Sequence, residues 1–137
     1  MKLESYLLSL PNNLSITLCK FRCPNTNLPI ERGRYYDVAR ENRICTLCNS
    51  QEIGDQFHYI FKCNFFANER RKYVRQNLSI YPNILNFQTL MCSTDRDTLL
   101  NLALFVKIVT LKLKWANSFL LLWCCKRKQN LRSMLWW

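Results

Sequence analysis

Four side chains of the kinds that bind metal ions fall within nineteen residues, in the pattern Cys45-x2-Cys48-x9-His58-x4-Cys63. A structural Zn²⁺ takes four tetrahedral nitrogen or sulfur donors, and a two-residue gap lets one tight turn direct both Cys45 and Cys48 at the same ion. The stretch between the first and last of these residues contains few aliphatic side chains, so it has little to fold around without a metal or a crosslink. The spacing therefore predicts a zinc knuckle of the CCHC type, with Zn²⁺ as its cofactor.

The residues before His58 predict how the second half of this site is built. Asp55 is typical of a helix N-cap, which places a short helix over residues 56–62 with His58 in its first turn. Residues four apart share a helical face, so a ligand five residues after His58 must lie at or beyond the end of the helix. We expect Cys63 to occupy that position.

The predicted site carries about one net negative charge, because three thiolates and a neutral imidazole outweigh Zn²⁺. Arg43 lies two residues before the first ligand, and Lys62 immediately precedes the last. We expect both to donate hydrogen bonds to the sulfurs and to help keep the thiols deprotonated.

Two other interpretations of the motif stay open. Buried free cysteines are common small hydrophobic residues, and a histidine among aromatic neighbours is often an ordinary core residue. Cys45 or Cys63 could instead act with His58 as a hydrolytic nucleophile, although the sequence shows no orienting acid or oxyanion motif.

The charge of the chain favours an anionic partner. Its 137 residues carry a net charge of +11, with an isoelectric point of about 9.5. This length suggests one domain, or a compact unit with a tail. Nucleic acid is a better match than an acidic membrane surface, and a basic protein without either partner is the alternative.

Eight cysteines would suit a secreted disulfide framework, but the first eight residues contain an early acid and no signal-peptide cleavage site. We therefore expect an intracellular protein, nuclear or cytoplasmic and not secreted. Reducing surroundings of that kind favour metal binding over a disulfide for Cys45 and Cys48.

Hydrophobic periodicity predicts a mainly α fold, in which a small helical unit with the zinc knuckle precedes a long C-terminal helix. That helix is apolar nearly all round, so we expect it to be buried or to have a packing partner. Its lysines interrupt the apolar run too often for a membrane span, and we expect no membrane partner. The predicted parts are a short N-terminal helix in 1–13, the helical CCHC unit in 14–80, a connector in 81–92, the helix in 93–114 and a basic, Trp-rich tail in 115–137.

Basic residues gather in two stretches that are candidates for contact with nucleic acid. In one stretch, arginines alternate with Tyr35 and Tyr36, a combination that can grip phosphates and stack on bases. In the other, Asn68 and three basic residues recur at helical spacing between residues 65 and 78, which predicts a basic stripe on one helix. Either set could equally be an ordinary solvated face. The candidates in these stretches are Arg32, Arg34, Arg43, Arg71, Lys72 and Arg75.

The stretch from about Leu14 to Val74 resembles the C-terminal zinc-binding region of reverse transcriptases from non-LTR (LINE-type) retrotransposons. The resemblance covers roughly half of the chain, the predicted 14–80 unit, and rests on LCKFRCPNTNLPIERGRYY, RENRICTLCN, EIGDQFHYIFKCNFF and ERRKY. It implies that Cys45, Cys48, His58 and Cys63 are metal ligands. It also implies a basic approach at 20–22 and 31–34, which adds Lys20 and Arg22 to the candidates for nucleic-acid contact. In that family the segment follows the polymerase domain and is thought to help hold template nucleic acid.

The chain lacks the paired aspartates of that family's polymerase domain. Its four aspartates include no adjacent pair, and two-metal polymerisation needs close carboxylates to hold Mg²⁺. We therefore expect no enzyme activity, because the chain resembles a non-catalytic fragment of a reverse transcriptase.

Two functions of different classes follow from the sequence. The first is a zinc-binding fragment that binds the phosphate backbone of DNA or RNA without sequence specificity and takes no small-molecule substrate. The second is a membrane-surface or protein-interaction module that acts through the Trp/Lys-rich tail in 115–137.

Overall fold

The computed structural model describes residues 8–133, with side chains as far as Ser118. These residues are mainly helical and contain no strand, only an isolated antiparallel bridge between Ile44 and Ile53. The predicted mainly α fold is thus confirmed. The elements are α2 (Asn12–Arg22), α3 (Pro29–Tyr35), η1 (Arg40–Asn42), η2 (His58–Lys62), η3 (Asn64–Phe66), α4 (Ala67–Tyr73), α5 (Gln76–Ser79), α6 (Ile84–Met91) and α7 (Arg96–Ser133).

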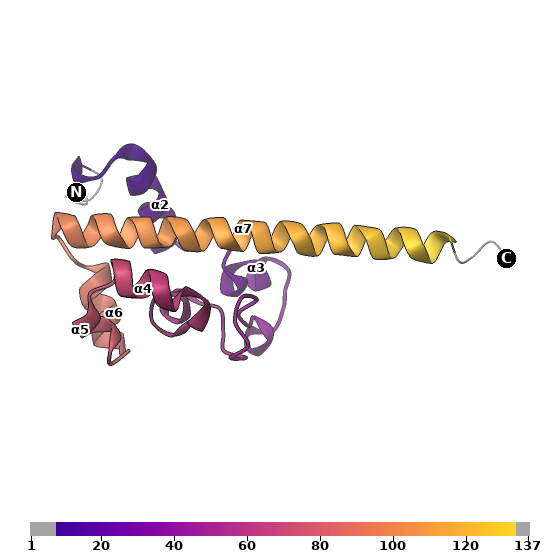
Figure 1. The fold of residues 1–137 in the computed structure, drawn as a ribbon, viewed down its shortest axis with the longest axis horizontal. Coiled ribbons are helices and arrows are strands. Elements are labelled where there is room, and N and C mark those ends of the chain that lie inside the picture. The colour runs from indigo at the N-terminus through magenta and orange to yellow at the C-terminus, as the bar shows by residue number, and fades with distance from the viewer. Residues whose placement is uncertain (1–7, 134–137) are drawn as a thin grey trace.

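The long helix α7 runs along the longest dimension of the molecule (Figure 1). It begins after Asp95, whose carboxylate accepts hydrogen bonds from the backbone and the hydroxyl of Thr98 and so satisfies a free donor of the first turn. The predicted helix over 93–114 is present, but it continues through the region predicted as a separate tail as far as Ser133. Residues 134–137 of that predicted tail lie outside the described residues.

The core forms where α2 and α4 pack against the first half of α7. Figure 1 shows α2 on one side of α7 and α4, α5 and α6 on the other. Leu14, Leu18 and Phe21 line the buried face of α2, as their spacing predicts. From α7 the buried side chains are Thr98, Leu99, Leu102, Ala103, Phe105, Val106, Val109 and Leu113.

Two predicted boundaries differ from the structure. The 81–92 connector contains α6, whose N-cap Asn83 accepts a hydrogen bond from the backbone of Asn86. The helix predicted between residues 65 and 78 is broken, because Val74 is extended and separates α4 from α5. Earlier in the chain, Pro29 begins α3 at the position where a missing N–H costs least.

The predicted N-terminal helix in 1–13 lies mostly outside the described residues, which begin at residue 8. Within the described residues α2 begins at Asn12, directly after Pro11. None of the helices that the structure describes combines the length and apolar character needed to cross a bilayer.

Candidate metal centre

A hairpin-like loop carries the first two cysteines. The backbone N–H of Cys45 donates to the carbonyl oxygen of Glu52 at 2.8 Å, and the backbone N–H of Gly54 donates to the carbonyl oxygen of Arg43 at 2.9 Å. Between these bonds the chain reverses, with Gln51 in the left-handed region at φ 58°. The turn therefore presents Cys45 and Cys48 from one side of the loop.

A short helical segment carries the other two residues. Asp55 caps it, since its Oδ1 accepts a hydrogen bond from the backbone N–H of His58 at 2.8 Å. This confirms the predicted N-cap. The segment then widens into the π-helix η2, and the N–H of Cys63, the residue just past its end, donates to the carbonyl of His58 at 2.8 Å. The prediction that Cys63 lies beyond the helix end is also confirmed.

The π winding explains how His58 and Cys63 come to face the same point. In an α-helix, residues five apart differ in direction by about 140° around the axis. A π-helix takes more residues per turn and pairs residue i with i+5, so the same spacing brings the two residues close to one side. The π-helical winding of η2 thus allows His58 and Cys63 to belong to one cluster.

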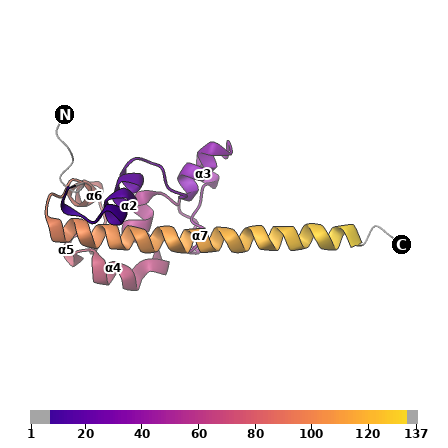
Figure 2. The same ribbon diagram turned by 90° about the horizontal axis from the view of Figure 1, so that it is seen from above.

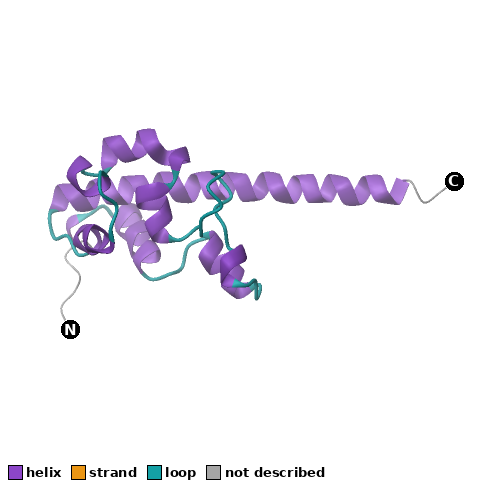
Figure 3. Cartoon of the chain, turned by 90° about the horizontal axis from the view of Figure 1, so that it is seen from below, coloured by secondary structure: helices purple, strands orange, loops and turns teal. Residues whose placement is uncertain are grey.

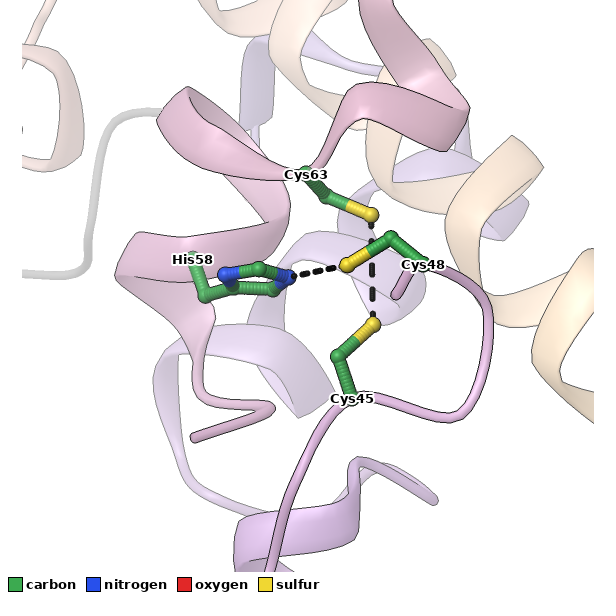
Figure 4. A group of neighbouring side chains, drawn as sticks. All are labelled: Cys45, Cys48, His58 and Cys63. Atoms are coloured by element: carbon green, nitrogen blue, oxygen red, sulfur yellow. Dashed lines mark hydrogen bonds between the residues drawn. The ribbon is translucent and has the colours of Figure 1, made fainter. Parts of the chain in front are cut away.

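All four donor atoms of Cys45, Cys48, His58 and Cys63 lie within 4.8 Å of one another. Figure 4 shows the four side chains directed toward one another. The sulfurs of Cys45 and Cys63 are 3.9 Å apart, and Nε2 of His58 is 3.3 Å from the sulfur of Cys48. Sulfurs on a tetrahedral Zn²⁺ lie about 3.8 Å apart, given Zn–S bonds of about 2.3 Å. The donor set and its spacing therefore fit one tetrahedral ion, and the 3.9 Å separation is far too long for a disulfide.

Burial and hydrogen bonding perturb the protonation of these side chains. Cys45, His58 and Cys63 are buried, while Cys48 is half-buried. A hydrogen bond from Cys63 holds the pKa of Cys45 well below its usual range, and the same contact, together with burial, raises the pKa of Cys63. Burial lowers the pKa of His58, but contacts with Cys45 and Glu52 outweigh it and raise the pKa to about 9. The cluster therefore already favours a thiolate at Cys45, the form that binds metal.

Glu52 orients the histidine. Its Oε2 lies 3.0 Å from Nδ1 of His58, which leaves Nε2 directed at the sulfurs, and its Oε1 lies 3.0 Å from Nζ of Lys62. A carboxylate on the remote ring nitrogen is the usual support of a metal-binding histidine. Glu52 was not identified from the sequence. Only two acids lie between Cys48 and His58, and one of them, Asp55, is the helix N-cap. Glu52 was therefore the one acid left in this stretch to support the histidine.

The predicted donors to the sulfurs are wrong. Arg43 donates instead to the carbonyl oxygens of Val38 and Ile30, and Lys62 pairs with Glu52. The sulfur of Cys45 lies 3.3 Å from the hydroxyl of Tyr59 and 3.5 Å from the backbone nitrogen of Leu47. The knuckle backbone and a buried tyrosine, rather than long cationic side chains, surround this sulfur.

Arg70 is a second contributor that the sequence did not reveal. From α4, its Nε donates to the carbonyl of Ile60 at 2.6 Å and its Nη2 to the carbonyl of Cys63 at 2.7 Å. These carbonyls lie at the end of η2, where intrahelical partners run out. Arg70 thereby ties α4, and through it α7, to the segment that carries His58 and Cys63.

The eight basic candidates for nucleic-acid contact do not share one surface. Figures 2 and 3 show α4 and α3 to either side of α7, while Figure 1 shows both below it, so the two helices lie on different faces around α7. On the α4 side, Arg71 bonds to Asn68, Lys72 lies over the ring of Tyr73, and Arg75 pairs with Asp95 at 2.9 Å. The break at residue 74 divides the predicted stripe. The other five candidates belong to the α2–α3 side: Lys20, Arg22, Arg32, Arg34 and Arg43.

Comparison with known proteins gives no match: no family model fits the chain, and neither a curated protein nor a solved structure is similar to it. The resemblance to retrotransposon reverse transcriptases therefore rests on the residues of the motif and its flanks alone. What the geometry itself shows is that Cys45, Cys48, His58 and Cys63 could together hold a metal ion.

Proposed function

We propose that this chain is a zinc-binding protein that binds nucleic acid through phosphate contacts, without sequence specificity, and that it derives from the C-terminal region of a retrotransposon reverse transcriptase. One observation carries the zinc assignment. Two separate segments bring three sulfurs and one ring nitrogen within 4.8 Å of one another, at a mostly buried position.

The donor set supports zinc in a structural role. Three thiolates and an imidazole are soft and borderline ligands, which suit Zn²⁺ better than Mg²⁺ or Ca²⁺. Catalytic zinc sites keep one corner open for water or substrate, whereas here the chain supplies all four. The proposal accordingly assigns no catalytic role to Cys45, Cys63 or His58.

The metal would strengthen the link between parts of the chain that side-chain contacts such as Glu52–His58 and Glu52–Lys62 already join. It would join the knuckle to η2, while Arg70 connects η2 to α4 and the amide of Gln56 donates to the carbonyl of Phe21 at the end of α2. Nucleic acid as the partner is supported by the net charge of +11 and by the exposed basic side chains of α2 and α3.

Metal content and nucleic-acid binding, measured on the same preparations, test the proposal. The full chain is expected to hold one equivalent of Zn²⁺ and to bind oligonucleotides with an affinity that falls steeply with salt. Cys63→Ser should lose the zinc and the affinity together. Cys23→Ser, which removes an exposed thiol outside the cluster, is the matched control and should lose neither. Zinc-free protein with undiminished affinity would refute the link between metal and binding.

A second candidate function is supported by α7. Leu113 is the last buried residue of α7 among the side chains described, which end at Ser118, and the helix continues to Ser133. Ile108, Leu111 and Trp115 line a shallow apolar hollow on its surface. A membrane surface or another protein could cover this region. Truncation after Lys114 separates the two functions, because nucleic-acid binding should survive it while binding through the tail should not.

A further inference from the structure

Three hollows adjoin one another on the side of the molecule formed by α2, α3 and α7. The first lies between α2 and α7, the second beside the loop before α3, and the third between α3, the knuckle and α7. Asn27 lines all three, and Arg32 and Tyr36 line both the second and the third. The hollows therefore make one continuous surface, which we call the Asn27 surface.

Cations lie at the α2–α7 end of the Asn27 surface. Lys20 of α2 and Lys114 of α7 are both exposed and line the same hollow, although 94 residues separate them in the sequence. Its other polar lining consists of hydroxyl and amide side chains, which can donate hydrogen bonds to anionic oxygens. Arg32 extends the positive charge into the other two hollows.

Two exposed tyrosines lie at the other end. Tyr35 is 85% exposed and Tyr36 is 66% exposed. Their rings meet edge to face, with the ring centroids 5.1 Å apart. Both line the hollow next to Arg32. Neighbouring aromatic faces that lie open to solvent beside a cationic channel are the arrangement on which the bases of a single strand stack.

Glu31 is the one acid among the residues that line the Asn27 surface. Its Oε2 accepts hydrogen bonds from the backbone and hydroxyl of Thr26, at 2.6 and 2.8 Å, and its Oε1 is buried without a hydrogen-bond partner among the described residues. Cations outnumber this acid along the three hollows, so the lining keeps a net positive charge.

We propose that the Asn27 surface binds a single strand of nucleic acid, with phosphates beside Lys20, Lys114 and Arg32 and with bases on Tyr35 and Tyr36. This inference rests on the proposed function and adds to it the contact surface and the type of strand. A duplex keeps its bases paired and stacked inside, so it could use the cations but not the tyrosines.

Binding of the zinc-loaded full chain to labelled oligothymidylate of about 15 nucleotides, and to a duplex of equal length, tests the proposal. The strand is expected to bind at least about tenfold more tightly than the duplex. Each of Y35A and Y36A alone should weaken strand binding by about 5- to 150-fold, and the two together by at least about 30-fold. Replacing both lysines by K20Q and K114Q should reduce the slope of log K against log salt by about 1.4, since each phosphate contact contributes about 0.7.

Matched controls remove the same groups elsewhere. Tyr81→Ala deletes a tyrosine that is 76% exposed on the link between α5 and α6, and Lys112→Gln deletes a lysine on another face of α7. Both should bind the strand as the parent does. Zinc content and thermal unfolding check that every variant is folded, which is expected because the replaced side chains are exposed.

Failure of the Asn27 surface can be told apart from failure of the proposed nucleic-acid binding. Equal affinity for strand and duplex, or tyrosine and lysine variants that bind like the parent, would overturn the Asn27 surface. If in addition Arg71→Gln with Lys72→Gln weakened binding, the contact would lie on α4 and the proposed function would stand. A zinc-loaded parent that binds no nucleic acid would overturn both.

Discussion

Raising the pH from 6.5 to 8.5 at a fixed free zinc concentration is expected to stabilise the metal-bound protein steeply. A bound ion keeps the thiols of Cys45, Cys48 and Cys63 deprotonated in the folded chain. In the unfolded chain the same thiols carry protons until the pH approaches the ordinary thiol pKa of about 8.5. Up to about pH 7.5 the unfolded state thus binds about three more protons, and the free energy of unfolding should rise by about 4 kcal/mol per pH unit. The slope should fall to about half this value at pH 8.5, where the unfolded thiols are half deprotonated.

Without metal the same range should show almost no slope. The pKa of His58 is raised to about 9, so this group alone would lose stability as the pH rises above 6.5. The pKa of Cys45 is lowered, so that group alone would gain stability over the same range. The two effects cancel, and Cys63, whose pKa is raised, keeps its proton in both states. Only below about pH 6.5, where the unfolded imidazole also takes a proton, should the metal-free chain lose stability.

Urea unfolding followed by circular dichroism, with buffered zinc or with a chelator, measures both slopes. Cys23→Ser should preserve the zinc-dependent slope, because that thiol lies outside the cluster. Cys63→Ser, which is expected to lose the zinc, should reduce it to the small slope of the metal-free chain. Equal slopes with zinc and with chelator would refute the assignment of the three thiolates as ligands.

Three substitutions test other parts of the structure. Glu52→Gln should weaken zinc binding about tenfold, because its carboxylate orients His58. Losses of about 10- to 100-fold are usual for such groups, and the low end is expected here because the carboxylate is 42% exposed. Competition with a chelator measures the affinity, and Glu41→Gln is the control that should not change it. Gly54→Ala should lower the free energy of unfolding by about 1 to 3 kcal/mol, since the new Cβ would lie 2.7 Å from a proline ring carbon of α3; an unchanged urea midpoint would contradict this. Phe105→Ala should cost about 3 to 5 kcal/mol because the ring is fully buried, whereas Leu111→Ala, at a half-exposed position, should cost less than about 1 kcal/mol.

Much of the candidate site could be predicted because its rules are local. Cysteine spacing implies a shared turn, Asp55 is a helix cap by residue type, and the gap from His58 to Cys63 requires the second residue to lie past a helix end. Each of these depends on a few neighbouring residues, and the structure bears them out. The fold class followed for the same reason, since hydrophobic periodicity reports helices directly.

Supporting contacts could not be predicted in this way. Arg70 reaches the carbonyl of Cys63 from another helix, and Tyr59 contacts Cys45 across 14 positions of sequence. Arg43 and Lys62 are close to the ligands in sequence, yet their side chains take other partners. Residues close in sequence have backbones that are close in space. A long side chain, however, bonds to whatever group the packing of the chain brings within its reach.

The sequence by itself determined the four donor residues, the helical character of the chain and its positive charge, because spacing, periodicity and composition need no knowledge of packing. Tertiary structure alone decided that η2 winds as a π-helix and that Lys20 and Lys114 line one hollow. It also placed α4, with its basic residues, on a different face around α7 from α3. The physical reason is that a helix's periodicity identifies its buried face, whereas the surfaces that its exposed residues share with other helices depend on how those helices pack.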